Sequence, residues 1–270
     1  MLTKKVIAMK RCILGLFIGL VFWGCNADTE PDPEMPYYDI DSYEYLDVPA
    51  QADRVVWQIP IDTVKRMTTK ALVQAILDYP LFFEVLTWAG HYYQRNFEVF
   101  YGDNNAFNEL IRRNDRGKVL LERLIDNNPV SSQDYNKQYQ ELLFELLIAQ
   151  VLIEDVKTLQ SIVRIALQRY ELRQKDPETS YLFVYRDITF VLISRAMLAA
   201  NYAPYVREVN KNQYLKYYTD GWIPKDVDPI YPEYPYVDRA FEYRYHLAEL
   251  DSYRQIIHAY GIIFLKLKTK

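Results

Sequence analysis

Glycine and cysteine are both scarce in this chain, and each shortage excludes classes of protein. Its 270 residues include eight glycines, three of them within the first 24 residues. Glycine-rich phosphate-binding loops need more, so the composition argues against nucleotide-binding α/β folds and favours helices. Both cysteines, Cys12 and Cys25, lie near the N-terminus. Residues 26–270 therefore offer no cysteine nucleophile and no disulfide.

Sequence signatures of catalysis are missing as well. The chain has no Gly-x-Ser-x-Gly, no His-Glu-x-x-His, no Walker loop and no dinucleotide fingerprint. We therefore expect no cofactor and favour a non-enzymatic role. The alternative is a hydrolase that acts on glycans through scattered carboxylates, because such acid and base pairs leave no local signature.

Positive charge is in short supply after residue 24. The first 24 residues carry four basic side chains and no acid, which leaves 28 basic and 36 acidic residues, a net charge of −8. An acidic surface repels phosphate backbones, so we expect no nucleic-acid partner. Half of all residues are hydrophobic, which is enough for a sizeable core.

The N-terminus has the pattern of an export signal. A basic start, in which Met9 is an alternative first residue to Met1, leads into the uncharged run 12–23. These twelve residues are too few to span a bilayer, which takes about 20, and fit the apolar core of a signal peptide. Gly24-Cys25 then resembles the lipobox of bacterial lipoproteins, which implies that residues 1–24 are removed and that Cys25 carries lipid. The alternatives are a short buried helix or an ordinary cleavage after Ala27.

Residues 25–58 form the predicted tether between lipid and domain. Four acidic residues and three prolines lie within 28–36, and both prolines and like charges extend a chain. The stretch is typical of a solvated linker; the alternative is an acidic sorting signal, similar to those of some Gram-negative lipoproteins. Asn26, not an aspartate, follows the cysteine, which by the same resemblance favours the outer membrane. We expect a protein that is attached to the outer membrane by its lipid and faces either the periplasm or the cell surface.

Apolar residues at helical spacing predict a helical domain over 59–221. The segment 181–202 is apolar nearly all round, which predicts a central buried helix. Short links indicate antiparallel helical hairpins, compatible with stacking into a short solenoid, so the expected fold class is all-α. The expected N-cap residues are Asp62, Thr68 or Thr69, Asn104 or Asn105, Asp115, Ser131 or Ser132, and Asp155. The expected inward residues include Phe107, Leu110 and Ile111, and the expected helix stops include Pro80, Pro177, Pro204 and Gly221.

Residues 222–270 combine a proline-rich loop, 222–237, with a segment that we expect to be helical from Asp238. The end of that segment, 264–268, alternates apolar and basic residues and also fits a strand.

Tyrosine is the unusual component of the loop. Tyr231 and Tyr234 each precede a proline at a spacing of three, which would line them along one edge of a polyproline II helix. Together with Trp222 they are the candidate residues for binding a protein or glycan ligand. The commoner role of such side chains is to hold a loop against the body of its domain, and that reading stays open.

One acidic helix face could in principle hold a metal. Glu242, His246 and Glu249 share a face at helical spacing, and Glu141 and Glu145 could add carboxylates. A di-iron bundle needs a second helix with Glu-x-x-His, which the sequence lacks. We expect a solvated charged face and no metal site.

Three parts of the sequence resemble an uncharacterised family of bacterial exported lipoproteins with the pattern M-[ST]-T-x-A-L-V…L-x-Y-P-L. The matching parts are 67–81, 108–121 and 199–205. The resemblance covers roughly residues 58–221 and leaves the last fifty unmatched. It implies helices and export; the family has no assigned activity, so it implies no site.

Overall fold

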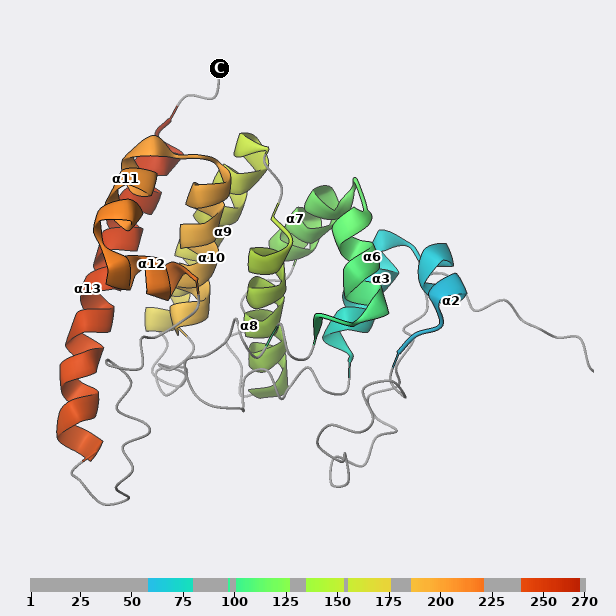
Figure 1. Cartoon of the computed structure of the whole chain (residues 1–270), viewed down its shortest axis with the longest axis horizontal. Helices are drawn as coiled ribbons and strands as arrows, with labels where there is room; N and C mark the ends of the chain where they lie inside the picture. The colour runs from blue at the N-terminus through green and yellow to red at the C-terminus, as the bar shows by residue number, and fades with distance from the viewer. Residues whose placement is uncertain are drawn as a thin grey trace, which may run out of the picture. The chain divides into compact units, whose positions relative to one another are not determined.

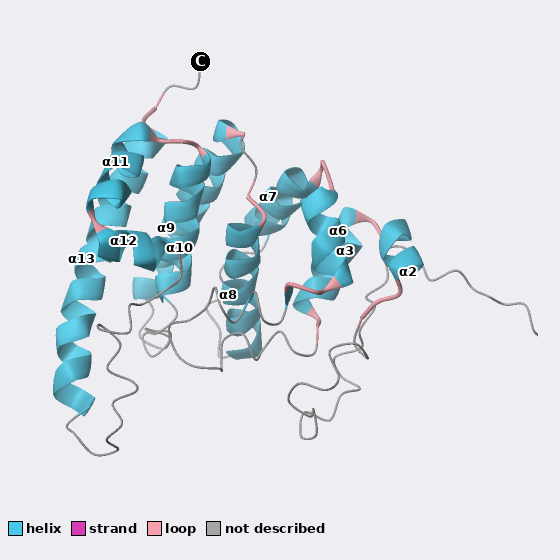
Figure 2. Cartoon of the chain, in the orientation of Figure 1, coloured by secondary structure: helices cyan, strands magenta, loops and turns pink. Residues whose placement is uncertain are grey.

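The computed structural model describes residues 58–79, 97, 101–126, 135–152, 155–175, 186–220 and 239–267. Within these ranges the chain forms ten α-helices and no strand (Figure 1, Figure 2), which confirms the all-α fold class. In the same ranges, none of the helices has the length and apolar character needed to span a bilayer. The helices are α2 (Ile61–Arg66), α3 (Thr69–Leu77), α6 (Asn105–Arg112), α7 (Arg116–Asp126), α8 (Tyr135–Gln150), α9 (Val156–Lys175), α10 (Arg186–Ala199), α11 (Ala203–Lys211), α12 (Gln213–Thr219) and α13 (Arg239–Leu265).

Side-chain caps begin several helices where the sequence predicts them. Thr68 Oγ1 accepts a hydrogen bond from the backbone N–H of Ala71 at 3.1 Å, at the start of α3. Asn104 Oδ1 accepts one from Phe107 at 2.9 Å, and Asp155 Oδ2 accepts one from Thr158 at 2.9 Å. Each cap satisfies a backbone donor that the first helical turn leaves without a partner. Ser131 and Ser132 lie outside the described residues.

Two of the local predictions for α2 and α6 are wrong. Pro60 is the N-cap of α2, and Asp62 lies inside the first turn, where its charge still favours the helix dipole. Asp115 precedes α7 as expected, and its carboxylate accepts a hydrogen bond from the Thr69 hydroxyl at 2.7 Å, which links α7 to α3. Ile111, expected to be inward, is 42% exposed, because the buried face of α6 is carried by Phe107 and Leu110.

The third correction concerns the end of α10. Asn201 has a φ of 49°, in the left-handed region that asparagine tolerates better than most residues. The N–H of Asn201 donates to Leu198 at 2.8 Å and that of Tyr202 donates to Met197 at 3.0 Å. This pair of bonds ends the helix as a Schellman motif. Pro204 does not end α10: it occupies the first turn of α11, a helix that the sequence analysis does not predict.

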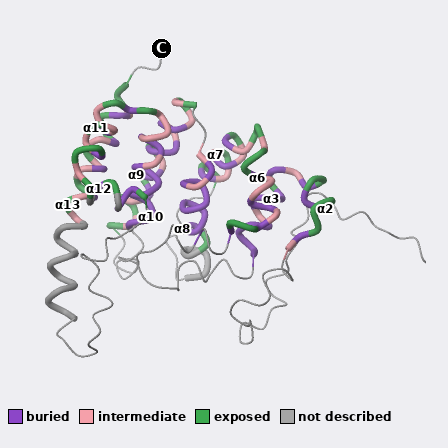
Figure 3. Tube along the Cα trace, viewed as in Figure 1, coloured by how far each residue is buried: buried purple, intermediate pink, exposed green. Residues whose placement is uncertain are grey.

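The helix α10 lies at the centre of the C-terminal half, as its all-round apolar pattern predicts (Figure 3). It packs against α8, α9, α11, α12 and α13. Thr189 contacts Arg173, and Ile193 and Leu167 both lie next to Gly261 of α13, so α9 and α10 run antiparallel, which fits the expected hairpin.

The helix α13 also belongs to this body, since it packs against both α9 and α10. A Cβ built on Gly261 would lie 3.4 Å from Ile193 and 3.5 Å from Leu167, so the helices approach closely there. The helix continues to Leu265 and a turn follows at Lys266, so the strand alternative for 264–268 is wrong for the described residues up to Leu267.

The N-terminal half is built around α3, which packs against α6, α7 and α8. Ala71, Leu72, Ala75 and Ile76 are all buried, as their helical spacing predicts. Tyr101 donates a hydrogen bond to the carbonyl oxygen of Ile76 at 2.9 Å, and its ring stacks on Phe97 with centroids 4.6 Å apart. Tyr101 thus satisfies a backbone carbonyl in the last turn of α3, and the stacked Phe97 ring packs beside it.

Candidate functional site

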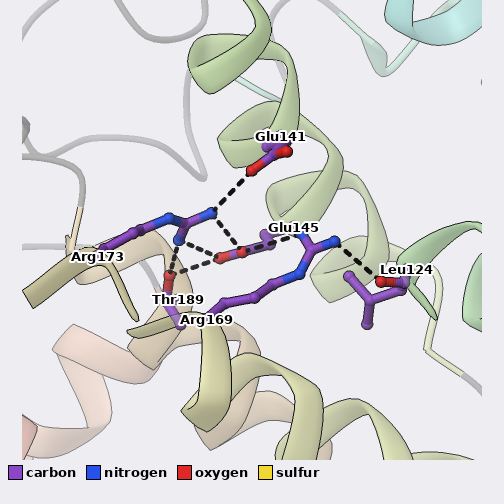
Figure 4. A network of polar contacts seen from close by, with 6 residues as sticks. All are labelled: Leu124, Glu141, Glu145, Arg169, Arg173 and Thr189. Carbon is purple, nitrogen blue, oxygen red and sulfur yellow. Dashed lines mark hydrogen bonds and ion pairs between the residues drawn. The ribbon is translucent and has the colours of Figure 1, made fainter. Parts of the chain in front are cut away.

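The most highly charged cluster in the described interior surrounds Glu145 of α8 (Figure 4). Its side chain is 0% exposed. Arg173 of α9 reaches both carboxylate oxygens, with Nη2 2.8 Å from Oε1 and Nη1 3.3 Å from Oε2. The Thr189 hydroxyl of α10 donates to Oε2 at 2.5 Å and accepts from Arg173 Nη1 at 2.9 Å. The contacts join three helices through one carboxylate.

A second guanidinium extends this cluster to a fourth helix. Arg169 Nη1 lies 3.6 Å from Glu145 Oε1, and Nη2 of the same residue donates to the carbonyl oxygen of Leu124 in α7 at 2.9 Å. Glu141 Oε2, one turn before Glu145, lies 3.7 Å from Arg173 Nη2. Two acidic residues on α8 therefore face two basic residues on α9, and their formal charges balance.

The electrostatics of the cluster keep it ionised. Burial alone would raise the pKa of Glu145, but Arg173, Arg169 and the hydrogen bonds from Arg173 and Thr189 hold it below its usual value. Burial would lower the pKa of Arg173, yet Glu145 and Glu141 hold it above its usual value. A general acid needs a proton to give, and a general base needs access to substrate. Glu145 has neither, so it suits neither role, and its contacts hold helices together.

A second buried ion pair joins α10 to α13. Arg254 Nη2 lies 2.8 Å from Asp187 Oδ1, and the Tyr218 hydroxyl of α12 donates to the same oxygen at 2.5 Å. Arg254 also contacts Asp251. Burial and the neighbouring Asp187 carboxylate raise the pKa of Tyr218, so the phenol keeps its proton and its role as donor.

Three buried hydroxyls form a further polar contact around α10. Ser194 Oγ lies 2.6 Å from the Tyr205 hydroxyl and 2.7 Å from Thr219 Oγ1, which donates to the carbonyl oxygen of Leu215 at 2.7 Å. All three residues are buried. Burial raises the pKa of Tyr205 to about 12. Among the described residues, these contacts give Ser194 no histidine or carboxylate of the kind that activates a serine nucleophile.

A smaller polar cluster joins the end of α3 to α7 and consists of Gln74, Asp78 and Arg123. Gln74 Nε2 donates to both oxygens of Asp78, at 2.7 and 2.8 Å, and Arg123 Nη1 donates to Gln74 Oε1 at 2.8 Å. The guanidinium of Arg123 also lies over the Phe144 ring, 5.2 Å from its centroid. Burial raises the pKa of Asp78, since Gln74 and Arg123 offset it only in part.

The candidate residues from the sequence fall into two groups. Cys25, Trp222, Tyr231 and Tyr234 lie outside the described residues. The positions of Glu242, His246 and Glu249 fall within α13, and their side chains also lie outside the description. Glu141 and Glu145 share one helix face and contact Arg173, which is an ion-pair role and not the metal-ligand role considered from the sequence. Among the described residues, no group of three or more His, Cys, Asp or Glu side chains could hold a metal ion.

Sequence reasoning missed the basic half of these clusters. The arginines of these clusters lie on the inward faces of their helices, at Arg169, Arg173 and Arg254. Apolar periodicity does not predict charged side chains at such positions. The available signal was spacing: Glu141 and Glu145 are four apart on one helix, and Arg169 and Arg173 are four apart on the next.

Comparison with known proteins adds no identification. No protein-family model matches the chain, no curated protein matches it, and no solved structure matches it.

Proposed function

We propose that this chain is a bacterial lipoprotein that Cys25 anchors to the outer membrane, and that its helical body is a non-enzymatic binding or assembly component. The observation that carries the proposal is the N-terminal order of basic residues, a twelve-residue apolar run and Gly24-Cys25. A lipid-modified cysteine anchors a chain stably when it carries more than one acyl chain.

The buried carboxylates of the described interior bear on the hydrolase alternative. The carboxylates of Glu145 and Asp187 are buried and paired with arginines, so they serve the fold. The hydrolase alternative needs two carboxyl groups that face a substrate, one of which can give a proton. It draws no support from these two carboxylates.

The binding partner that we propose is a protein or a glycan, and Trp222, Tyr231 and Tyr234 are its candidate contacts. Tyrosine and tryptophan offer large, rigid surfaces with one polar group, which suits both kinds of partner. The net charge of −8 after residue 24 argues against nucleic acid as that partner.

Membrane fractionation tests the anchor. The full chain and a Cys25→Ala variant are expressed in a bacterium, and the envelope is separated into inner-membrane, outer-membrane and soluble fractions. We expect the wild-type chain in the outer-membrane fraction, from which detergent releases it and high salt does not. The variant should leave that fraction. Equal amounts of both chains in the outer membrane would overturn the proposal.

A further inference from the structure

Exposed apolar side chains concentrate at the C-terminal end of α13. Seven large apolar side chains are exposed among the described residues, and three of them, Ile262, Ile263 and Leu267, fall within six consecutive positions. The other four are distributed singly over α2, α6, α7 and α9. Single exposed apolar residues are ordinary on protein surfaces, whereas a group of them indicates a contact surface.

The geometry of α13 separates this group from the buried face of the same helix. Gly261 faces Ile193 and Leu167, and Phe264 is 1% exposed, so these positions pack into the body. Ile262 and Ile263 are 39% and 50% exposed. Lys266 is exposed and lies in the turn after the helix, where its backbone N–H donates to the carbonyl oxygen of Ile263 at 3.0 Å. We call Ile262, Ile263, Lys266 and Leu267 the tip surface; Figure 3 shows exposed residues at this end of the chain.

The sequence at and after the tip surface is basic. The chain contains no acidic residue after Asp251, and Lys266, Lys268 and Lys270 fall within its last five positions. Taken as a whole, the chain after residue 24 is acidic, with a net charge of −8 that already includes these lysines. Apolar side chains beside lysines are the composition of segments that lie in a membrane interface, where the apolar groups enter the acyl boundary and the lysines meet anionic headgroups.

We propose that the tip surface contacts an anionic lipid bilayer. Two copies that met symmetrically through their tip surfaces would bring lysines of like charge together, which disfavours a dimer through this surface. Three partly exposed apolar side chains are also far fewer than the roughly 20 residues a side of a stable protein interface. The proposal rests on the proposed lipid anchor. Because the anchor already holds the chain at the bilayer, a second contact that would be weak for a free chain becomes intramolecular and therefore stronger.

A fluorophore at the tip surface tests this contact. Position 263 is changed to cysteine (Ile263→Cys) and labelled with a polarity-sensitive dye in the full chain, with the chain lacking the substitution as the labelling background. The matched control is Ile125→Cys on α7, at a side chain that is 57% exposed. Each protein is mixed with vesicles of phosphatidylethanolamine and phosphatidylglycerol, or with vesicles of phosphatidylcholine. We expect a blue shift and brighter emission at position 263 in the anionic vesicles, a smaller change in phosphatidylcholine, and none at position 125. Lys266→Glu should reduce the shift in anionic vesicles only.

Three outcomes overturn the proposal of a tip contact. If the chain binds the vesicles while the dye at position 263 stays in water, the tip contact is wrong and the anchor is still supported. A blue shift without vesicles shows that a second copy covers the surface, and equal shifts at positions 263 and 125 show unspecific adsorption. The mass of the N-terminal peptide from the same samples reports the anchor separately. A shift at position 263 in a chain without lipid would keep the tip contact and remove the anchor.

Discussion

Arg254 of α13 contacts one oxygen of Asp187 in α10 through two nitrogens, with Nε and Nη2 each 2.8 Å from Oδ1. The two residues are 67 positions apart, and both are buried. Asp187 also lies in the first turn of α10, where a negative charge favours the helix dipole. One carboxylate thus stabilises the start of the central helix and the position of the last one.

Replacing Asp187 with asparagine should therefore be costly. Arg254 would stay buried without its main counter-charge, and removal of one partner of a buried pair costs about 3–5 kcal/mol of the free energy of unfolding. Urea unfolding measures the loss. The matched control is Asp251→Asn, since Asp251 also contacts Arg254 but its side chain is 49% exposed; we expect less than about 1 kcal/mol there. Equal losses in the two variants would show that Asp187 has no special role.

The Glu145 cluster predicts a similar loss with a defined pH dependence. Glu145→Gln leaves two guanidinium groups near a neutral amide, so we expect about 3–5 kcal/mol at pH 7. The pKa of Glu145 is lowered in the folded chain. Its stabilisation is therefore complete above the unfolded pKa of about 4.3 and is lost as the pH falls through the lower folded pKa.

Unfolding curves of wild type and Glu145→Gln over a range of pH check this sign. The difference between them should be constant near neutral pH and should shrink below about pH 4. Glu122→Gln is the surface control, because Glu122 is exposed and lies 3.8 Å from the exposed Lys118; it should match wild type throughout. A Glu145→Gln difference that grows on acidification would contradict the assignment.

Asp78 should behave in the opposite way. Burial raises its pKa in the folded chain, so the wild type should become more stable relative to an uncharged variant as the pH falls through that pKa towards about 3.9. Asp78→Asn keeps an oxygen that can accept from Gln74 Nε2. At pH 7 we expect the variant to lie within about 1 kcal/mol of wild type. A loss as large as that of Glu145→Gln would mean that Asp78 forms a stabilising pair with Arg123.

The tyrosines of the proline-rich loop can be assigned by stability alone. If Tyr231 and Tyr234 form a ligand-binding edge, replacing both with serine should change the free energy of unfolding by less than about 1 kcal/mol, while binding to a protein or glycan partner falls. If they pack against the body, the cost should approach the roughly 3–5 kcal/mol of a truncated buried aromatic residue. A melting curve of the double variant distinguishes the two and needs no ligand.

Local sequence chemistry predicted much of the fold. Thr68, Asn104 and Asp155 all cap helices at the expected positions, because a side-chain oxygen before an apolar helical pattern has one favoured role. The uniform apolarity of α10 predicted its central position, since a helix without a polar face must be covered on all sides.

Long-range polar contacts were beyond such reasoning. Arg173 and Thr189 meet Glu145 only because three helices converge, and the sequence around each residue resembles an ordinary charged or polar helix position. The end of α10 was missed for a related reason. Proline is a strong signal for a helix stop, but here Asn201 adopts the left-handed conformation first, which leaves Pro204 free to begin α11.

The central claim is that Cys25 carries lipid, and its most direct test is the chemical state of that residue. Cells that express the full chain or Cys25→Ala are grown with radiolabelled fatty acid, and the N-terminal peptide of the purified chain is examined by mass spectrometry. We predict that the wild-type chain takes up label and that Cys25→Ala does not. The N-terminal peptide of the wild-type chain should begin at Cys25 and carry a diacylglycerol thioether on that residue. An unlabelled chain, a variant that takes up equal label, or an N-terminus at Asp28 after ordinary cleavage would contradict the account.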